Sequence, residues 1–482
     1  MGDYSIPASL NKNRVFLLHR SELEQRFDPF YYVPDLVELE KKVLTKKPKK
    51  LRDFVKSIAS GATPKTTESE KYYSEKGQGV PFLRVQNLSP TGILEFDNCK
   101  YINKETHTGM LERSQVTAGD LLVKITGVGR MAVASVAPEG FYGNINQHVC
   151  VIKTGSKEIS ETLAAFLNSD IGEILASRRS TGGTRPALDY PALLSIPILY
   201  DKKILEITKK VVEQKIQFET EAENLLTNID AYLLNELGIT LPNPLEPNLK
   251  ERIFLSTSRK LCGNRLDPFY YKSSFTALIE SISNGKYQVA KLGSVSCNID
   301  TGRTPPKSAY LDGDEQDILP IIKAGSYTGD FIDLEKSDFV NSCFSGNPVK
   351  KGDIFILGAA HQAEFVGKKV YYLSQEPRGK TFFVGELVRI SVNDSICESS
   401  FLFSLLKTSV YMDLLNREKR GQTSHLYPSD VKHIIIPVPP ISKQKEIASH
   451  ITNIRQQAQK LKDKTKALLE NANKEIKDII LN

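Results

Sequence analysis

The chain has 482 residues, of which 40% are hydrophobic and 25% charged, a composition typical of a globular protein with roughly two to four domains. Its formal net charge of +7 permits a polyanionic partner without requiring one. No apolar run approaches membrane-spanning length, and six separated cysteines without a Cys-x-x-Cys pair suit a reducing compartment, so we expect a cytoplasmic protein with no membrane contact and no zinc ribbon.

The first domain is predicted over residues 1–200, including an N-terminal extension. Strand-like runs lie between Gly, Asn and Pro turns, and one helical stretch is expected at 161–177. The strand-like runs are 80–85, 120–125, 148–152 and 193–199. Residues 41–56 hold eight Lys and Arg against the single acid Asp53, which fits either a solvated surface segment or a contact to phosphate.

A long helix is predicted over 201–239. Asp201 is a suitable N-cap, Gly238 is a suitable C-cap, and no proline lies between them. Apolar residues recur every seven positions, at Ile204, Val211, Phe218, Leu225 and Tyr232. Such a stripe needs an equally long partner. Residues 442–482 supply one, because their apolar residues alternate steps of four and three, so the two helices are predicted to form an intramolecular coiled coil.

A linker is predicted at 240–251, where three prolines keep the chain extended. The second domain follows at 252–441. It has one helical stretch at 399–419 and an apolar run at 434–438, directly before the C-terminal helix.

The two domains repeat one another in sequence. Arg26-Phe-Asp-Pro-Phe-Tyr-Tyr32 recurs as Arg265-Leu-Asp-Pro-Phe-Tyr-Tyr271, at an offset of 239 residues. Further matches pair Arg14-Val-Phe-Leu17 with Arg252-Ile-Phe-Leu255, Ser60-Gly-Ala-Thr-Pro64 with Thr301-Gly-Arg-Thr-Pro305, Pro81-Phe-Leu-Arg84 with Pro320-Ile-Ile-Lys323, and Ala118-Gly-Asp120 with Lys351-Gly-Asp353. Since a long helix closes each copy, the chain is predicted to be a tandem duplication.

Several motifs resemble catalytic or cofactor sites, and each lacks a necessary part. Asp28-Pro-Phe-Tyr31 faintly resembles the Asp-Pro-Pro-Tyr of amino-methyltransferases, but it occurs twice without a methyl-donor motif, so a structural turn with packed aromatics is favoured. Gly127-Val-Gly-Arg-Met-Ala132 has the letters of a dinucleotide fingerprint but precedes a strand-like run instead of a helix. Gly379-Lys-Thr381 ends like a P-loop without its first glycine. The seven histidines show no metal-ligand spacing, so no catalytic or metal site is predicted.

What remains is a binding signal: polar, planar side chains that can pair with base edges gather in turn-rich parts of both domains. In the first domain the candidate DNA-binding residues are Arg84, Gln86, Asn87, Lys124, Arg130, Asn144, Asn146, Gln147, Arg178, Arg179, Thr184 and Arg185. In the second domain they are Arg303, Lys307, Lys323, His361, Gln362, Lys380, Arg417, Lys419, Arg420, Gln422 and His425. Each cluster alone is typical of a solvated surface, and their recurrence in both copies favours nucleic-acid binding.

Taken together, these residues resemble the specificity subunits of type I restriction–modification systems, over nearly the whole chain. In the second half the resemblance rests on Gly421-Gln-Thr423 and on Ile436-Pro-Val-Pro-Pro-Ile-Ser-Lys-Gln-Lys-Glu-Ile447, which enters the C-terminal helix. In the first half it rests on Ser60 to Pro64, Gly119-Asp120, Ile125-Thr-Gly-Val-Gly129 and Asn146-Gln147. The copies also differ, since the second reads Phe382-Phe-Val-Gly-Glu-Leu387 where the first has Asn146-Gln147, as expected if the two domains read different sequences.

The resemblance implies a mixed α/β (α+β) fold with two pseudo-symmetric target-recognition domains, separated by two long antiparallel helices that form a coiled coil. It implies a non-catalytic subunit that reads a split target in double-stranded DNA and docks two DNA methyltransferase subunits and motor-nuclease (restriction) subunits. S-adenosylmethionine, ATP and Mg²⁺ are then expected in the partners, and no cofactor in this chain. Two other functions stay open: a coiled-coil adaptor that binds proteins instead of DNA and, disfavoured by the missing cofactor motifs, a self-sufficient DNA methyltransferase.

Overall fold

The computed structural model describes residues 7, 9–24, 26–243, 253, 265–313, 316–421 and 424–482. These form two compact units: unit 1 is Met1–Glu219 with Lys462–Asn482, and unit 2 is Thr220–Leu461. Most of the predicted linker at 240–251, and most of the repeat segment 252–255, lie outside the described residues. Within the described part of the chain, no helix combines the length and apolar character needed to cross a membrane.

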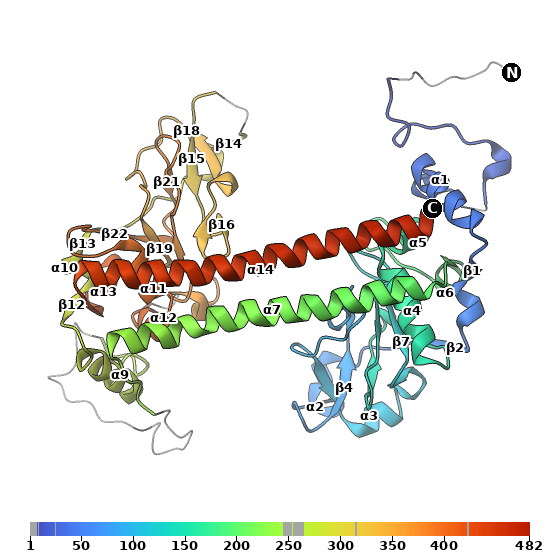
Figure 1. Ribbon diagram of the computed structural model, residues 1–482, viewed down its shortest axis with the longest axis horizontal. Coiled ribbons are helices and arrows are strands. Elements are labelled where there is room, and N and C mark those ends of the chain that lie inside the picture. Colours follow the sequence, from blue (N-terminus) through green and yellow to red (C-terminus); the bar gives the residue numbers. More distant parts are fainter. Residues whose placement is uncertain are drawn as a thin grey trace. The chain divides into compact units, whose positions relative to one another are not determined.

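Unit 1 is built on two β-sheets (Figure 1). The first sheet is antiparallel throughout. Its strand order is β2 (Ser57–Ser60), β10 (Val149–Lys153), β7 (Leu121–Lys124), β8 (Ala134–Val136). The order of the second is β3 (Tyr73–Ser74), β5 (Lys100–Ile102), β4 (Val80–Leu83), β9 (Tyr142–Ile145), β6 (Gln115–Thr117), in which β4 and β9 run parallel. Alternate residues of β7 enter different cores, because Leu121 and Val123 pack with the helices while Leu122 packs with the second sheet. The first sheet is therefore buried on both faces, which explains its continuous apolar strands.

The helices of unit 1 are α1 (Pro34–Thr45), α2 (Ser69–Tyr72), α3 (Lys104–Thr108), α4 (Lys157–Asn168), α5 (Asp170–Arg179) and α6 (Tyr190–Leu194), and the short strands β1 (Lys49–Lys50) and β11 (Pro197–Ile198) pair with each other. Short 3-10 helices lie at Arg20–Glu22, Pro29–Tyr32, Leu51–Phe54, Thr66–Glu68, Val85–Asn87 and Glu112–Ser114. The single helix predicted at 161–177 is two helices, because the Ser169 hydroxyl accepts from the Gly172 N–H at 3.0 Å and so caps a new helix.

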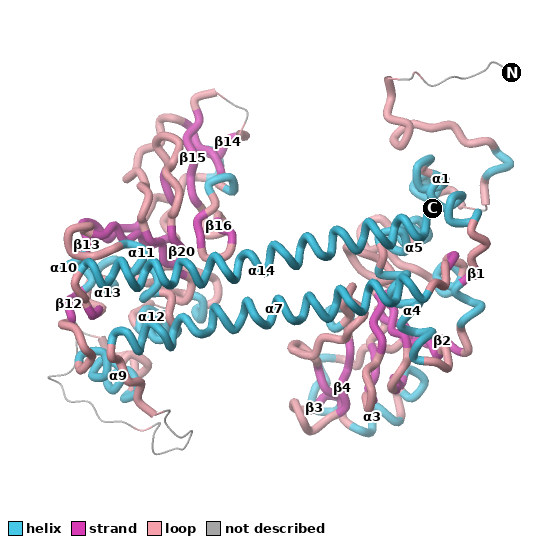
Figure 2. The backbone as a smooth tube through the Cα atoms, in the orientation of Figure 1, coloured by secondary structure: helices cyan, strands magenta, loops and turns pink. Residues whose placement is uncertain are grey.

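Unit 2 also has two sheets, shown in magenta in Figure 2. The order of the first is β13 (Ser296–Thr301), β22 (Leu387–Val392), β19 (Ile354–Leu357), β20 (Val370–Tyr372), β17 (Phe331–Ile332), β16 (Tyr327–Thr328). The order of the second is β14 (Tyr310–Leu311), β18 (Asp338–Asn341), β15 (Ile318–Ile322), β21 (Phe382–Phe383), in which β15 and β21 run parallel. The shorter strands β12 (Val289–Lys291) and β23 (Ile435–Pro437) pair with each other.

The shorter helices of unit 2 are α9 (Ser273–Ser283), α10 (Leu292–Val295), α11 (Ser399–Leu406), α12 (Ser409–Arg417) and α13 (Pro428–Val431), with 3-10 helices at Lys307–Ala309, Leu334–Lys336 and Ala363–Phe365. Here too the single helix predicted at 399–419 is two helices. The side chain of Thr408 caps the second one by accepting from the Tyr411 N–H at 3.3 Å.

The strand orders confirm the predicted duplication. The order β2-β10-β7-β8 is repeated by β13-β22-β19-β20, and β3-β5-β4-β9 is repeated by β14-β18-β15-β21. The matching Gly-Asp turns are also equivalent: Gly119 and Gly352 have φ of 83° and 92°, a region that favours glycine, and Asp120 and Asp353 each accept a backbone N–H three residues earlier. The copies differ at their sheet edges, where unit 1 adds β6 and unit 2 adds β17 and β16.

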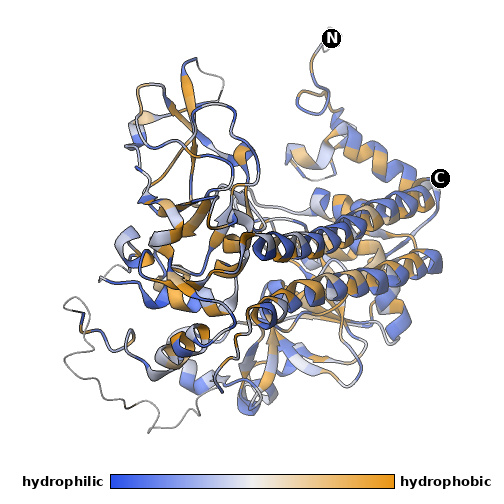
Figure 3. Ribbon diagram, turned by 60° about the vertical axis from the view of Figure 1, so that its left-hand side comes forward, coloured by the Kyte–Doolittle hydropathy of each residue, from blue (hydrophilic) through white to orange (hydrophobic). Residues whose placement is uncertain are grey.

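Two long helices, α7 (Lys202–Leu237) and α14 (Ile441–Leu481), contribute to both units. In the core of unit 1, Ile204 near the start of α7 clusters with Ile480 near the end of α14. In the core of unit 2, Leu233 near the end of α7 clusters with Ile447 near the start of α14. Both helices carry mixed polar and apolar residues along their length, as expected for helices with one apolar stripe (Figure 3). Because opposite ends meet in each core, the helices are antiparallel, as predicted.

Candidate nucleic-acid interface

In unit 1, the repeated Arg-x-Asp-Pro-Phe-Tyr-Tyr motif is bound to the end of helix α5, a contact that we call the clasp. Arg26 donates to the carbonyl of Arg179 at 3.0 Å, at the end of α5. Arg178 and Arg179 are only 5% and 7% exposed, and both guanidinium groups pair with the buried Glu40 carboxylate. The Nε of Arg178 also donates to the Tyr31 carbonyl at 2.7 Å. The structure therefore places these two predicted DNA contacts inside unit 1, where both guanidinium groups pair with one carboxylate.

The same clasp occurs in unit 2. Arg265 donates to the carbonyls of Arg417 (2.9 Å) and Lys419 (2.6 Å), at the end of α12. Arg417 pairs with Glu418 at 3.1 Å and donates through Nε to the Tyr270 carbonyl at 2.8 Å. Burial lowers the pKa of Lys419, whose ammonium donates to backbone and side-chain oxygens of its own unit. Arg417 and Lys419 are thus also held within the fold, which leaves their exposed neighbours as the better candidates for a DNA contact.

Three predicted amides of unit 1 are buried as well. The Asn87 side chain accepts from the Arg84 N–H and donates to the Glu95 carbonyl, each at 2.9 Å, which holds a turn together. Asn144 donates to the Leu111 carbonyl at 2.8 Å and pairs with a histidine side chain. Asn146 is 7% exposed, and its oxygen accepts from the His148 N–H at 3.1 Å. These three amides are therefore turned into unit 1 and bonded there, away from the surface.

The Lys124 side chain is hydrogen-bonded to the glycine-rich turn that follows β7. Its Nζ donates to the carbonyls of Val128 (2.8 Å) and Arg130 (2.9 Å), and burial lowers the pKa of this ammonium. Arg130 itself is half-buried and bonds to Asp170 at 3.2 Å. Two carbonyl oxygens of the turn thus face Lys124, and the turn leads into strand β8 and not into a helix.

Several predicted residues of unit 1 meet on its surface. The exposed Gln147 accepts a hydrogen bond from the Thr63 hydroxyl, and Arg185 lies 3.0 Å from the His148 ring nitrogen. Thr63, Gln147, His148 and Arg185 are called the unit 1 loop cluster. Partial burial, followed by the Arg185 charge, lowers the pKa of His148, so the imidazole is neutral near pH 7 and presents one donor and one acceptor.

Backbone contacts fix this cluster in place. A Cβ added to Gly61 would lie 1.6 Å from the Ile145 carbonyl oxygen, so only glycine lets the Thr63 loop pass this close to β9. The Gly127 N–H donates to the Pro186 carbonyl at 3.0 Å, which ties the Arg185 loop to the turn after β7. The other exposed predictions, Gln86 and Thr184, lie on neighbouring turns, and half-buried Arg84 donates to the Asn98 carbonyl at 2.8 Å.

Unit 2 brings the equivalent loops together with different side chains. Thr304 donates to Glu386 at 2.8 Å and accepts from the Gly385 N–H at 3.0 Å. The loop after β19 joins them, because the Gly358 N–H donates to the Glu386 carbonyl at 2.8 Å. The hairpin with Arg420 and His425 completes the group, since the Leu426 N–H donates to the Gly358 carbonyl, also at 2.8 Å. Thr304, Glu386, Arg420 and His425 are called the unit 2 loop cluster.

The remaining predicted residues of unit 2 are on its surface. Arg420 pairs with Asp430 at 3.0 Å and lies over the Tyr427 ring, and Lys323 pairs with Asp338. The exposed ones are Arg303, Lys307, Lys323, His361, Gln362, Lys380 and Arg420. Gln422 lies outside the described residues. The Lys-rich segment 41–56 of unit 1 also keeps its basic side chains exposed, which leaves a contact to phosphate open.

Sequence reasoning missed Thr63, Thr304 and Glu386. The repeated Gly-x-Thr-Pro could have identified the two threonines, since a hydroxyl retained in both copies beside a required glycine is a useful signal. Glu386 carries no such signal, because an isolated carboxylate in a turn has no pattern. Within the described ranges, His, Cys, Asp and Glu side chains nowhere gather in threes as a metal ion would need.

Comparisons with known proteins give two kinds of similarity. Residues 284–471 match the sequence model of the type I restriction modification DNA specificity domain. A search of curated proteins gives no match. Among solved structures, the chain is similar to one described under complex assembly and conformational transition of the type I R-M system, with 17% identity, 90% of this chain and 95% of that chain covered, and a TM-score of 0.44. It is also similar to a type I restriction-modification S subunit from M. genitalium, with 15% identity, 90% and 94% coverage, and a TM-score of 0.41.

Proposed function

We propose that this chain, whose residues 284–471 belong to the type I restriction modification DNA specificity domain family, is the DNA-reading subunit of a type I restriction–modification complex. The observation that carries the proposal is the pair of loop clusters. The same loops converge in both units, but Gln147 and Arg185 occupy one cluster where Glu386 and Arg420 occupy the other. Two units that share the same loop arrangement but carry different side chains suit a DNA target with two different halves.

The exposed side chains have the chemistry for this task. Glutamine can pair bidentately with adenine and arginine with guanine in the major groove, and glutamate can accept from cytosine. The exposed lysines suit phosphate contacts, which position a protein on DNA without reading sequence. Each unit would then read one half of a split target in double-stranded DNA.

Two methyltransferase subunits and motor-nuclease subunits are the proposed protein partners, within the cytoplasm. In that assembly S-adenosylmethionine, ATP and Mg²⁺ would be bound by the partners, which would carry out methyl transfer and cleavage. This chain would supply recognition alone. The exposed faces of α7 and α14 carry lysine and glutamate side chains on which partner helices could dock.

Co-expression with candidate methyltransferase subunits, followed by genome-wide mapping of methylated sites, tests the proposal. We expect one motif with two different halves and a fixed spacer, and no methylation without this chain. The purified chain alone should bind DNA with an affinity that falls as salt rises. A chain that supports no motif and shows no salt-dependent binding to DNA would be a protein-binding adaptor. Methyl transfer by the purified chain alone would make it a methyltransferase.

A further inference from the structure

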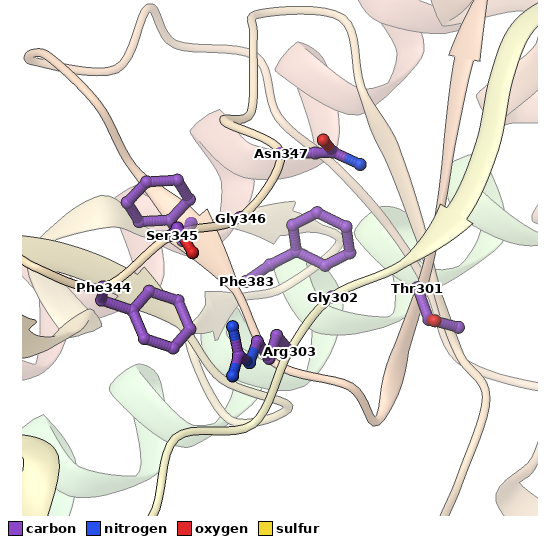
Figure 4. Close-up of a pocket in the computed structure, with 9 residues that line it drawn as sticks. Thr301, Gly302, Arg303, Phe344, Ser345, Gly346, Asn347 and Phe383 are labelled. Atoms are coloured by element: carbon purple, nitrogen blue, oxygen red, sulfur yellow. The ribbon is translucent and has the colours of Figure 1, made fainter.

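We propose that a cavity in unit 2 binds a single DNA base displaced from its stack, an inference that rests on the proposed function. The cavity has a volume of about 140 Å³ and opens beside the loop that carries Arg303 (Figure 4). Its lining residues are Thr301, Gly302, Arg303, Phe344, Ser345, Gly346, Asn347, Phe382 and Phe383. None of them belongs to the unit 2 loop cluster, so the cavity is a separate site.

Aromatic rings form much of its wall. Phe344 and Phe382 meet edge to face, with ring centres 5.5 Å apart, and Phe383 lies on the same strand as Phe382. The Arg303 guanidinium lies beside the Phe344 ring in Figure 4, with its central carbon 6.0 Å from the ring centre. The face of one aromatic ring with a planar cation at its edge is suited to stacking an aromatic base.

A buried ion pair next to the lining residue Asn347 holds one wall of the cavity in place. The Arg389 guanidinium pairs with Asp300 at 2.7 Å, and its Nη1 donates to the Pro348 carbonyl at 2.7 Å. The Asn347 amide donates to the same Asp300 carboxylate at 2.7 Å. The loop that lines the cavity is thus held at two neighbouring residues, Asn347 and Pro348. A cavity whose walls are already ordered loses little entropy when a ligand enters.

Size and chemistry restrict the ligand. A volume of about 140 Å³ is below the range of pockets that hold drug-sized ligands or cofactors, which begins near 300 Å³. A base within a duplex has neighbours on both faces, so it can enter the cavity only after leaving the stack. The Arg303 donors and the Ser345 hydroxyl at the rim could then meet the polar edge of that base.

Unit 1 does not repeat this arrangement. The residue of β9 equivalent to Phe382 is Asn144, because each precedes by one residue the position that pairs with the end of the neighbouring parallel strand. Asn144 is buried and bound to His107 and Leu111, and Ala62 stands at the position of Arg303. The displaced base is therefore expected in only one half of the target.

The test uses the purified full chain without methyltransferase subunits, because those subunits would themselves extrude the base that they methylate, and duplexes that carry the mapped motif. The fluorescent base 2-aminopurine, which brightens when it leaves the stack, replaces one base at a time in both halves. The wild-type chain is expected to raise fluorescence severalfold at one position of one half, and the Phe344→Ala and Arg303→Ala variants should abolish that rise. Phe331→Ala is the matched control, because its ring packs on Tyr372 and Phe403 and not on the cavity.

Three outcomes would overturn the cavity proposal: no bright position in either half, a bright position that persists in both cavity variants, or one that Phe331→Ala also removes. Phe344→Leu, which fills the cavity without a flat ring, keeps the test decisive if Phe344→Ala does not fold. A failure of the proposed function would look different. In that case the wild-type chain, co-expressed with methyltransferase subunits, would show no methylation motif and no sequence preference at all.

Discussion

Arg178 and Arg417 hold equivalent positions in the two units: each donates through Nε to the carbonyl of a tyrosine in the repeated motif, at 2.7 and 2.8 Å. Their guanidinium carbons lie 4.1 and 3.7 Å from the ring centres of the same tyrosines, Tyr31 and Tyr270. The duplication has therefore preserved a cation stacked on an aromatic ring at the end of a helix. Preservation of this contact reflects the stability of each unit and not its choice of DNA sequence.

Arg178→Ala should destabilise unit 1 without changing the methylated motif. Because Glu40 still pairs with Arg179, the expected cost is that of the lost buried hydrogen bonds to Glu40 and Tyr31, about 1–3 kcal/mol of unfolding free energy. Denaturant unfolding measures this cost. Arg185→Ala, which removes the same charge from an exposed position, is the control: it should weaken DNA binding and leave the unfolding free energy within about 0.5 kcal/mol of the wild type. The reverse pattern would contradict this assignment.

Gln147→Ala should relax one half of the target and leave the other half intact. Loss of a bidentate base contact lowers discrimination at one position by about 1–3 kcal/mol. Arg420→Ala should affect only the opposite half, or weaken binding to all sequences if its contact is to phosphate. Methylation mapping of each variant gives the result, with Gln78→Ala as an exposed glutamine control outside the loop cluster. A single substitution that alters both halves would refute the two-reader proposal.

Glu418 should make the stability of the chain depend on pH. Burial raises the pKa of Glu418 to about 7, against the weaker opposing effect of Arg417 and Arg265. The folded chain then keeps a proton on Glu418 at pH values where the unfolded chain has released it. The stability that this group contributes is therefore fully present below about pH 4.5 and is lost as pH rises through about 7. The loss attributable to this group is at most about 3 kcal/mol.

Melting curves of the wild type and Glu418→Gln between pH 5 and 8 measure this effect. The wild type should lose more stability than the variant as pH rises, because glutamine cannot ionise. Parallel pH profiles for the two proteins would show that burial of Glu418 is not responsible.

Removing one heptad from each long helix should shorten the spacer of the methylated motif. Deleting 209–215 from α7 and 467–473 from α14 keeps both apolar stripes in phase and shortens each helix by about 10 Å. At 3.4 Å per base step, that corresponds to about three base pairs. The control deletes two residues from each helix, which rotates one part of each apolar stripe by about 200° relative to the rest and should lower the melting temperature. A folded heptad-deletion variant with an unchanged spacer would show that the lengths of these helices do not set the length of the spacer.

Much of the fold could be predicted because its signals are periodic or repeated. The heptad stripe located α7 almost to the residue, and the repeated Arg-x-Asp-Pro-Phe-Tyr-Tyr motif revealed the duplication that the strand orders confirm. The breaks at Ser169 and Thr408 were missed, because apolar periodicity continues through both caps. A serine or threonine inside a helical pattern can face solvent or begin a new helix, and only tertiary packing selects between these.

The candidate site was harder to predict because a basic residue looks the same in sequence whether it is buried or exposed. Arg178 and Arg179 precede a flexible glycine pair and so resembled a DNA contact. Their partner Glu40 lies 138 and 139 residues earlier in the chain, beyond any local pattern. Gln147 and Arg185 were selected because they are planar polar side chains in turn-rich parts of the chain, and the structure leaves both exposed.

The shared helices also determine the order in which the chain can fold during synthesis. The core of unit 1 includes Ile476 and Ile480, which the ribosome adds only after all of unit 2 has been made. Until then, the nascent first unit presents Ile204 and Leu205 without the partners that bury them. Exposed apolar surface of this kind is a substrate for chaperones and a route to aggregation. A ribosome that stalls inside α14 would therefore release a chain whose earliest-made domain is the one left unfinished.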